Sequence, residues 1–277
     1  MKKIFITAIA ALSLFIADAQ LKTPAPSPTQ TIKQDFGLSS IELSYSRPGM
    51  KGRKIFGDLV PFGKVWRTGA NSASTLTFGE DVTIGGKKVV AGKYGLLTIP
   101  EKNTWTIIIT KQLDVTSPAA YKPDQDVVRV MAEPMKMGDV METFTMQFAN
   151  IKPGSCDLQL MWEKTAVSLP VTTDVETKVM AQIDQQMNKD NHPYYNAALY
   201  YMENGKDLNQ ALAWFDKAVE LQPTAFWIHH QRANALAKLG KKDEAKMAAE
   251  KSKALAIEQK NDDYVKLNEK LIAELNK

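Results

Sequence analysis

A change of hydrophobic period near residue 173 constrains the fold of this chain more than any other feature. Before this point apolar residues alternate with polar ones, as at Ile41 and Leu43, and a period of two is typical of strands with one buried face. After it, apolar residues recur three and four positions apart, which is the spacing of one helix face. We therefore expect a β-rich domain at residues 31–172 and an α-helical domain at residues 173–277.

The first domain consists of short alternating runs separated by turn signals. Two of these runs enclose Gly85-Gly86, and glycine readily adopts the positive φ angles that tight hairpin turns require. The connections leave no room for the crossover helices of a parallel sheet. We therefore predict an antiparallel β-sandwich or barrel-like domain. Further strands are expected at Tyr94–Ile99, Trp105–Thr110, Val127–Ala132, Val140–Phe148, Leu158–Trp162 and Ala166–Val171.

The clearest helix of the second domain is predicted between Asp207 and Pro223. Asp207 is a suitable N-cap, Gln210 stands where a capping box requires it, and Pro223 cannot continue a helix. Helices over residues 173–188 and 261–275 are expected to cover the two ends of the helical domain.

A shift of 34 residues relates this helix to the part of the chain that follows it. Ala211 falls on Ala245, whereas Phe215 falls on Ala249. The period, together with small residues in the second helix, resembles the tetratricopeptide repeat. Ala249 departs from the repeat, which usually has a bulky aromatic residue there. The resemblance implies a short tetratricopeptide-like array that binds a protein partner.

The N-terminus has the pattern of a secretory signal peptide at residues 1–19. Met1-Lys2-Lys3 precedes an uncharged, mostly apolar run, and Ala17-Asp18-Ala19 matches the small-residue cleavage pattern. We expect cleavage after Ala19, a proline-rich tail at residues 20–30, and a periplasmic or secreted product. The apolar run is shorter than the roughly 20 residues that cross a bilayer, so we expect it to be a cleaved signal and not a membrane anchor. No later stretch of the sequence is apolar enough to span a membrane, so no transmembrane anchor is expected after cleavage.

Charge, histidine and cysteine content narrow the function classes. The chain has 35 basic and 31 acidic residues, whereas nucleic-acid binders usually carry a concentrated basic face. We therefore expect no nucleic-acid partner. His192, His229 and His230 are the only histidines. The β-rich domain therefore cannot hold a Ser-His-Asp or Cys-His centre, and we expect no metal or cofactor there. Cys156 is the single cysteine, so no intrachain disulfide can form, and we expect it to be buried.

Residues 46–71 follow neither a strand nor a helix period, although they are rich in large apolar side chains. They also contain six basic residues against one acid, Asp58. A long irregular segment inside a compact domain is uncommon and is often functional. We expect the apolar side chains to hold this segment on a sheet, and its glycines to let the backbone pass close to a neighbour.

The same segment carries a specific resemblance. Its motifs are Ser46-Arg47-Pro48, Lys51-Gly52-Arg53, Ile55-Phe56-Gly57, Leu59-Val60-Pro61 and Trp66-Arg67-Thr68-Gly69-Ala70-Asn71. They resemble an exported bacterial family known as domain of unknown function 2911, over residues 25–170. The resemblance implies a β-rich exported domain and no particular activity. Phe62 stands where that family often has tyrosine.

Five residues of the segment are candidates for a ligand site. Arginine offers a planar fork that suits carboxylate, sulfate or phosphate, tryptophan offers a stacking face, and asparagine both donates and accepts hydrogen bonds. The alternative is that the arginines brace the segment through backbone carbonyls, with the tryptophan in the core. The candidates are Arg47, Arg53, Trp66, Arg67 and Asn71.

These observations favour an exported, non-catalytic binding or assembly protein. Its β-rich domain would hold an anionic or sugar-like envelope ligand, and its repeats would bind a protein. One alternative is a hydrolase of envelope glycans that uses two carboxylates, which requires an acid and a base about 5–10 Å apart. Another is a purely structural scaffold, which predicts no pocket beside the arginine-rich segment. The acids considered for hydrolysis are Asp58, Glu80, Asp81 and Glu133.

Overall fold

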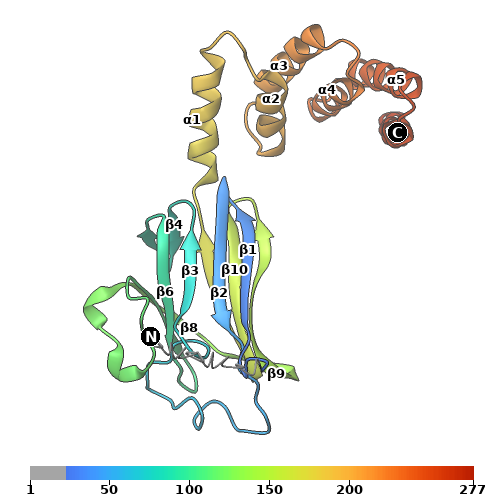
Figure 1. Cartoon of the computed structure of the whole chain (residues 1–277). Helices are drawn as coiled ribbons and strands as arrows, with labels where there is room; N and C mark the ends of the chain where they lie inside the picture. Colours follow the sequence, from blue (N-terminus) through green and yellow to red (C-terminus); the bar gives the residue numbers. More distant parts are fainter. Residues whose placement is uncertain (1–22) are drawn as a thin grey trace, which may run out of the picture. The chain divides into compact units, whose positions relative to one another are not determined.

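The computed structural model describes residues 23–277, and the chain divides into two compact units between Asp174 and Val175. Strands make up the first unit and helices the second (Figure 1). The predicted signal peptide, residues 1–19, lies outside the described residues and stays a prediction.

Two antiparallel sheets form the β unit. The first has the strand order β1-β2-β3-β6-β7-β8 and the second the order β5-β4-β10-β9. Buried apolar side chains from both sheets form one core, which confirms the predicted antiparallel sandwich. In chain order the strands are β1 (Thr29–Phe36), β2 (Ser39–Ser46), β3 (Ser74–Phe78), β4 (Val82–Ile84), β5 (Lys87–Val89), β6 (Gly92–Ile99), β7 (Trp105–Thr110), β8 (Asp126–Ala132), β9 (Met135–Lys152) and β10 (Ser155–Thr172).

The alternation of side chains explains most of these strands. Along β2, Ile41, Leu43 and Tyr45 are buried while the residues between them are partly exposed. The turn at Gly85-Gly86 joins β4 to β5, with φ angles of 57° and 75° at the two glycines. The hairpin predicted from these two glycines is therefore confirmed.

The prediction of two strands at Leu158–Trp162 and Ala166–Val171 is wrong, because both belong to β10. The pairing of β10 with β9 shifts register on both sides of Glu163, which has a φ of 55°. A β-bulge of this kind bends a strand without ending it. The bulge interrupts the alternation of apolar and polar residues, and that interruption resembles a turn in the sequence.

The helical unit contains six helices among the described residues. Its core is built mainly from alanines and a few large side chains. Asp207 caps α3 by accepting hydrogen bonds from Asn209 N and Gln210 N, so the predicted N-cap is confirmed. The helices are α1 (Val175–Met187), α2 (Tyr194–Glu203), α3 (Leu208–Leu221), α4 (Phe226–Lys238), α5 (Lys242–Glu258) and α6 (Asp262–Leu275).

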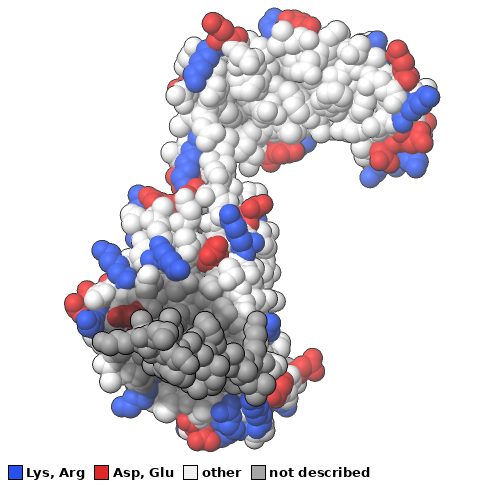
Figure 2. Space-filling view, viewed as in Figure 1, with Lys and Arg blue, Asp and Glu red and all other residues white. Residues whose placement is uncertain are grey.

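The described surface drawn in Figure 2 carries charges of both signs. Acidic and basic side chains are intermixed on the face shown in Figure 2. Within residues 23–277, no helix combines the length and the apolar character needed to cross a membrane.

Tyr45 joins the two sheets through its hydroxyl group. Tyr45 Oη donates to Met146 O at 2.9 Å and accepts from Met146 N at 2.8 Å, so β2 of the first sheet holds the backbone of β9 in the second. Burial raises the pKa of Tyr45 above its ordinary value. A tyrosine hydroxyl is protonated at neutral pH in any case, and the shift extends the protonated range to higher pH.

We predict that Tyr45→Phe lowers the free energy of unfolding by about 1–3 kcal/mol, because it leaves buried backbone groups of Met146 without a partner. Urea denaturation of the protein measures this change. Tyr94→Phe is the matched control, because Tyr94 Oη donates to the carbonyl of Val90, a residue that is 57% exposed and whose carbonyl can bond to water instead. Equal losses in the two variants would contradict the role given to Tyr45.

Candidate functional site

The irregular segment 46–71 is tied to both sheets of the β unit. Trp66 and Thr98 of β6 exchange two backbone hydrogen bonds, of 2.7 and 2.9 Å. At the other end of the segment, Phe144 N of β9 donates to Pro48 O at 2.9 Å. Ile55, Phe56 and Val60 are buried in the core between these two attachments. The apolar side chains therefore hold the segment in place, as expected.

Five aromatic rings pack at the place where the segment enters the core. Trp66 stacks on Trp162 of β10 with ring centroids 5.8 Å apart, and it meets Phe144 edge-on at 5.0 Å. Phe56 lies 4.8 Å from Trp105 of β7, also edge-on. Rings from the segment and from both sheets thus form one aromatic cluster: Phe56, Trp66, Trp105, Phe144 and Trp162.

Each of the three candidate arginines donates a hydrogen bond to a backbone carbonyl. Arg47 donates to Phe144 O and to Thr145 Oγ1, at 3.2 and 2.8 Å. Arg53 donates to Gly49 O and Met50 O, at 2.8 and 2.9 Å. These contacts brace the segment, as the structural alternative described. A ligand role for Arg47 and Arg53 stays a prediction.

The other three candidates have different surroundings. Asn71 donates from Nδ2 to Ser46 Oγ at 3.1 Å. Trp66 donates from Nε1 to Gly69 O at 3.0 Å, and Arg67 donates to Thr116 O at 2.8 Å. Arg67 Nε is buried and has no acceptor among the described residues. Of the five candidates, Trp66 and Arg67 border the same hollow.

This hollow, the arginine cavity, has a volume of about 200 Å³. One wall comes from segment 46–71 and the other from the connection between β7 and β8. Lys64 and Arg67 are its only charged lining residues, so its electrostatic potential favours anions. The purely structural alternative predicted no pocket here. The cavity is lined by Leu59, Val60, Pro61, Lys64, Val65, Trp66, Arg67, Ser117 and Pro118.

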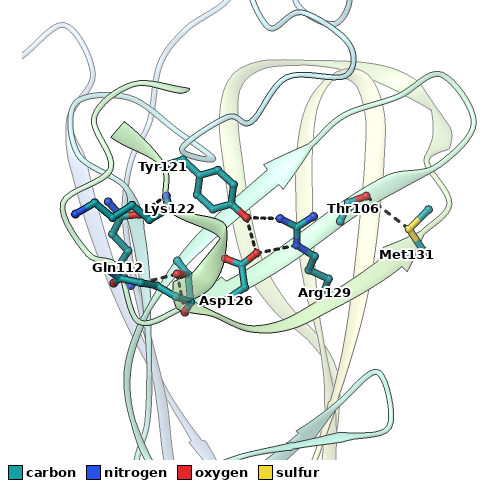
Figure 3. A network of polar contacts seen from close by, with 9 residues as sticks. Thr106, Gln112, Tyr121, Lys122, Asp126, Arg129 and Met131 are labelled. Atoms are coloured by element: carbon teal, nitrogen blue, oxygen red, sulfur yellow. Dashed lines mark hydrogen bonds and ion pairs between the residues drawn. The ribbon is translucent and has the colours of Figure 1, made fainter. Parts of the chain in front are cut away.

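The connection between β7 and β8 is held in shape by a network of polar contacts (Figure 3). Tyr121 donates its hydroxyl proton to Asp126 Oδ2, and Arg129 donates to both groups, with 2.7 Å between Arg129 Nε and Asp126 Oδ2. Gln112 binds the backbone of the same connection at Ala120 O and Lys122 N, at 2.7 and 2.9 Å. These contacts fix the second wall of the arginine cavity.

Sequence reasoning did not select the connection between β7 and β8 as part of a site. Its polar residues carry no recognisable spacing, because Tyr121 and Arg129 meet only when the connection folds back beside the start of β8. The signal in the sequence that could have pointed to this connection is its proline content. Two prolines, Pro118 and Pro123, each begin a short 3₁₀ helix and stiffen the segment.

A second hollow lies on another side of segment 46–71. This lysine cavity has a volume of about 310 Å³. Phe62 reaches it by packing over Gly57, where φ is 86° and a Cβ atom would lie 2.7 Å from the Phe62 ring. The cavity is lined by Phe56, Phe62, Glu101, Lys102, Trp105, Pro134, Met135, Lys136, Lys164 and Thr165.

The acids considered for hydrolysis are not among the residues that line these two cavities. Glu80 Oε1 accepts from Leu38 N, and Asp81 Oδ1 accepts from Ala91 N, so both serve turns. The arginine cavity has no carboxylate in its lining, and the lysine cavity has Glu101 alone. Neither cavity supplies the pair of carboxylates that glycan hydrolysis requires.

Cys156 of the β unit is buried, and so are His229 and His230 of the helical unit. Burial raises the pKa of the Cys156 thiol to about 11, which keeps it protonated and unreactive near neutral pH. His229 binds Pro223 O at 2.9 Å, and burial lowers its pKa. His230 Nδ1 lies 2.8 Å from Asn268 Oδ1. Among the described residues, no group of three His, Cys, Asp or Glu side chains could hold a metal ion.

The helical unit has apolar hollows of its own beside α1. One of about 430 Å³ lies between α1 and the pair α2–α3, and we call it the α1 cavity. Asp184 is its only charged lining residue, so its surface is mainly apolar. It is lined by Met180, Ala181, Ile183, Asp184, Met187, Tyr201 and Trp214.

Both units match known protein families. A two-sheet β unit with an embedded irregular segment precedes an array of helices. The family described as Protein of unknown function (DUF2911) matches residues 27–171, and tetratricopeptide repeats match residues 192–224 and 214–247. The first match covers more than half of the chain, so this protein belongs to that family. Both resemblances seen in the sequence are confirmed. No curated protein matches the chain.

Stability should depend on pH through Tyr121. Burial, together with the hydrogen bond to Asp126, raises its pKa from the ordinary 10 to about 12. Below pH 10 the group is protonated in the folded and unfolded states alike. Between pH 10 and 12 the unfolded state loses the proton first, so the free energy of unfolding falls as pH rises.

We predict that Tyr121→Phe makes this decline less steep. It should also cost about 1 kcal/mol of stability at neutral pH, through the lost hydrogen bonds. Urea denaturation at a series of fixed pH values measures both effects. Parallel curves for the variant and the wild type would show that Tyr121 does not titrate differently in the two states.

Proposed function

We propose that this protein is an exported, non-catalytic binding or assembly protein. Its helical repeats bind a protein partner, and its β unit holds an anionic, sugar-like ligand of the cell envelope in the arginine cavity. The observation that carries the proposal for the ligand is the lining of that cavity, where Lys64 and Arg67 flank Trp66 and no acid is present.

The chemistry of the arginine cavity suits a carboxylated sugar. A guanidinium binds carboxylate through charge-assisted hydrogen bonds, and the indole of Trp66 offers an apolar surface to a sugar ring. Both walls are anchored, one by the aromatic cluster and the other by the contacts of Gln112 and Tyr121. A cavity between fixed walls loses little conformational freedom when it binds a ligand.

Protein binding rests on the repeat match and on the α1 cavity. Stacked helical repeats present extended surfaces to their partners. Met180 and Met187 line the α1 cavity together with Trp214, and methionine adapts its shape to varied apolar partners. We assign the α1 cavity to an apolar side chain of the protein partner.

The ligand proposal predicts that an oligomer of uronic acid raises the melting temperature of the mature protein. A ligand at 100 times its Kd stabilises the folded state by about 2.7 kcal/mol, whereas a neutral oligosaccharide of equal length should have a much smaller effect. Lys64→Gln should reduce the shift. Lys64 has no hydrogen bond or ion pair with the described residues, so the variant should fold normally.

Lys54→Gln is the matched control, because it removes the same charge from an exposed position of segment 46–71 outside the cavity. Arg67→Lys tests the planar fork while keeping the charge. An identical shift in wild type, Lys64→Gln and Arg67→Lys would place the ligand elsewhere. No shift with any uronic acid oligomer would reject the ligand.

The partner proposal predicts that a charge in the α1 cavity disrupts protein binding. We expect Met187→Glu to weaken capture of the partner from an extract of the source cells by at least tenfold, because a carboxylate is costly to bury. Gln185→Glu adds the same charge on the exposed side of α1. Quantitative mass spectrometry should find a protein that wild type and Gln185→Glu retain and Met187→Glu loses. Equal capture by all three would contradict the assignment.

A further inference from the structure

We propose that the lysine cavity is a second ligand site of the β unit, and that its ligand is a phosphorylated sugar. This site is separate from the arginine cavity, and the inference does not depend on the ligand assigned there. Three features of the lysine cavity support it: the origin of its lysines, its aromatic lining, and its balance of charge and size.

The three lysines of the cavity come from different parts of the chain. Lys102 lies in the connection between β6 and β7, Lys136 lies near the start of β9, and Lys164 lies in β10 next to Thr165, which pairs with Lys136. None of the three forms an ion pair among the described residues. Three like charges around one hollow repel one another, and a bound anion would relieve that repulsion.

The inner lining of the cavity is aromatic. Trp105 is 2% exposed and Phe56 is 8% exposed, so both rings are held firmly by the core. Phe62 is partly exposed, and its segment is fastened by the hydrogen bond from Gly63 N to Pro100 O, of 3.0 Å. Rigid aromatic surface beside cationic groups suits a ligand that has both a ring and a charged group.

Charge and size narrow the class of ligand. Three lysines against the single carboxylate of Glu101 leave two positive charges, which match the dianion of a phosphate monoester. Lysine binds phosphate as a point charge, and it needs no planar geometry in its partner. A volume of about 310 Å³ accommodates a single sugar ring with its phosphate. Glu101 is available to accept a hydrogen bond from a sugar hydroxyl group.

Glucose 1-phosphate is a suitable probe, with glucose and inorganic phosphate as its two halves. Isothermal titration calorimetry on the full mature chain should give a measurable Kd for glucose 1-phosphate. Each half should bind at least about tenfold more weakly, because the ring and the phosphate use different parts of the cavity. Raising the salt concentration should weaken binding, because exposed charges are screened.

Variants locate the site. The double variant Lys136→Gln with Lys164→Gln should weaken binding by about tenfold or more, and Phe62→Ala should weaken it while leaving the lysines in place. Lys64→Gln, in the arginine cavity, and Lys54→Gln, outside both cavities, should leave the Kd unchanged. Melting temperatures of all variants check that each one folds.

Several outcomes would overturn the proposal. Absence of heat at 10 mM glucose 1-phosphate would reject the ligand class. An unchanged Kd in the double lysine variant and in Phe62→Ala would place binding outside the lysine cavity. Inorganic phosphate binding as tightly as glucose 1-phosphate would reduce the site to a general anion site and reject the sugar.

Discussion

The packing of aromatic rings between the two sheets is the interaction on which the β unit most depends. Trp66 comes from the irregular segment, yet its ring stacks on Trp162 of β10 and its backbone pairs with Thr98 of β6. One residue therefore attaches the segment to both sheets. Aromatic pairs of this kind contribute about 0.5–1.5 kcal/mol each beyond the burial of their area. Segment 46–71 is thus a part of the core, although it has no regular structure.

Both cavities follow from this arrangement. Phe56 is buried in the core and Trp66 packs against it. The arginine cavity takes its basic residues from the segment, whereas the lysines of the lysine cavity come from other parts of the chain. Phe56 lines the lysine cavity and Trp66 lines the arginine cavity, and the two rings meet at 6.2 Å. The cavities therefore share the aromatic cluster as a common wall. A ligand that shifted either ring would also change the neighbouring cavity.

Periodicity predicted the sandwich and the helical array because both depend on local patterns that burial imposes on the sequence. Alternation along Ile41 and Leu43 identifies a strand wherever its partner lies. The bulge at Glu163 depends on the register of β9 with β10, and the contact of Tyr121 with Arg129 depends on how the connection between β7 and β8 folds. No local pattern encodes either of them. The sequence did not predict the lysine cavity either, because Lys102 and Lys164 are distant in the sequence and only the fold brings them together. The sequence identified the arginines of segment 46–71 as candidates because of their residue type. It could not show which backbone carbonyls they bind.

The two ends of the helical array differ in how well they are closed. At the C-terminal end, Asn268 of α6 donates to Ser252 Oγ of α5 at 2.8 Å, and Ser252 donates to Phe226 O of α4 at 2.7 Å. These contacts are buried, so α6 closes the array with satisfied polar groups. At the other end α1 buries only Ile183. Two repeats alone present little core, and their ends must be covered. The end beside α1 is the less protected one, which is why the α1 cavity is the place where a partner would add most to the stability of the array.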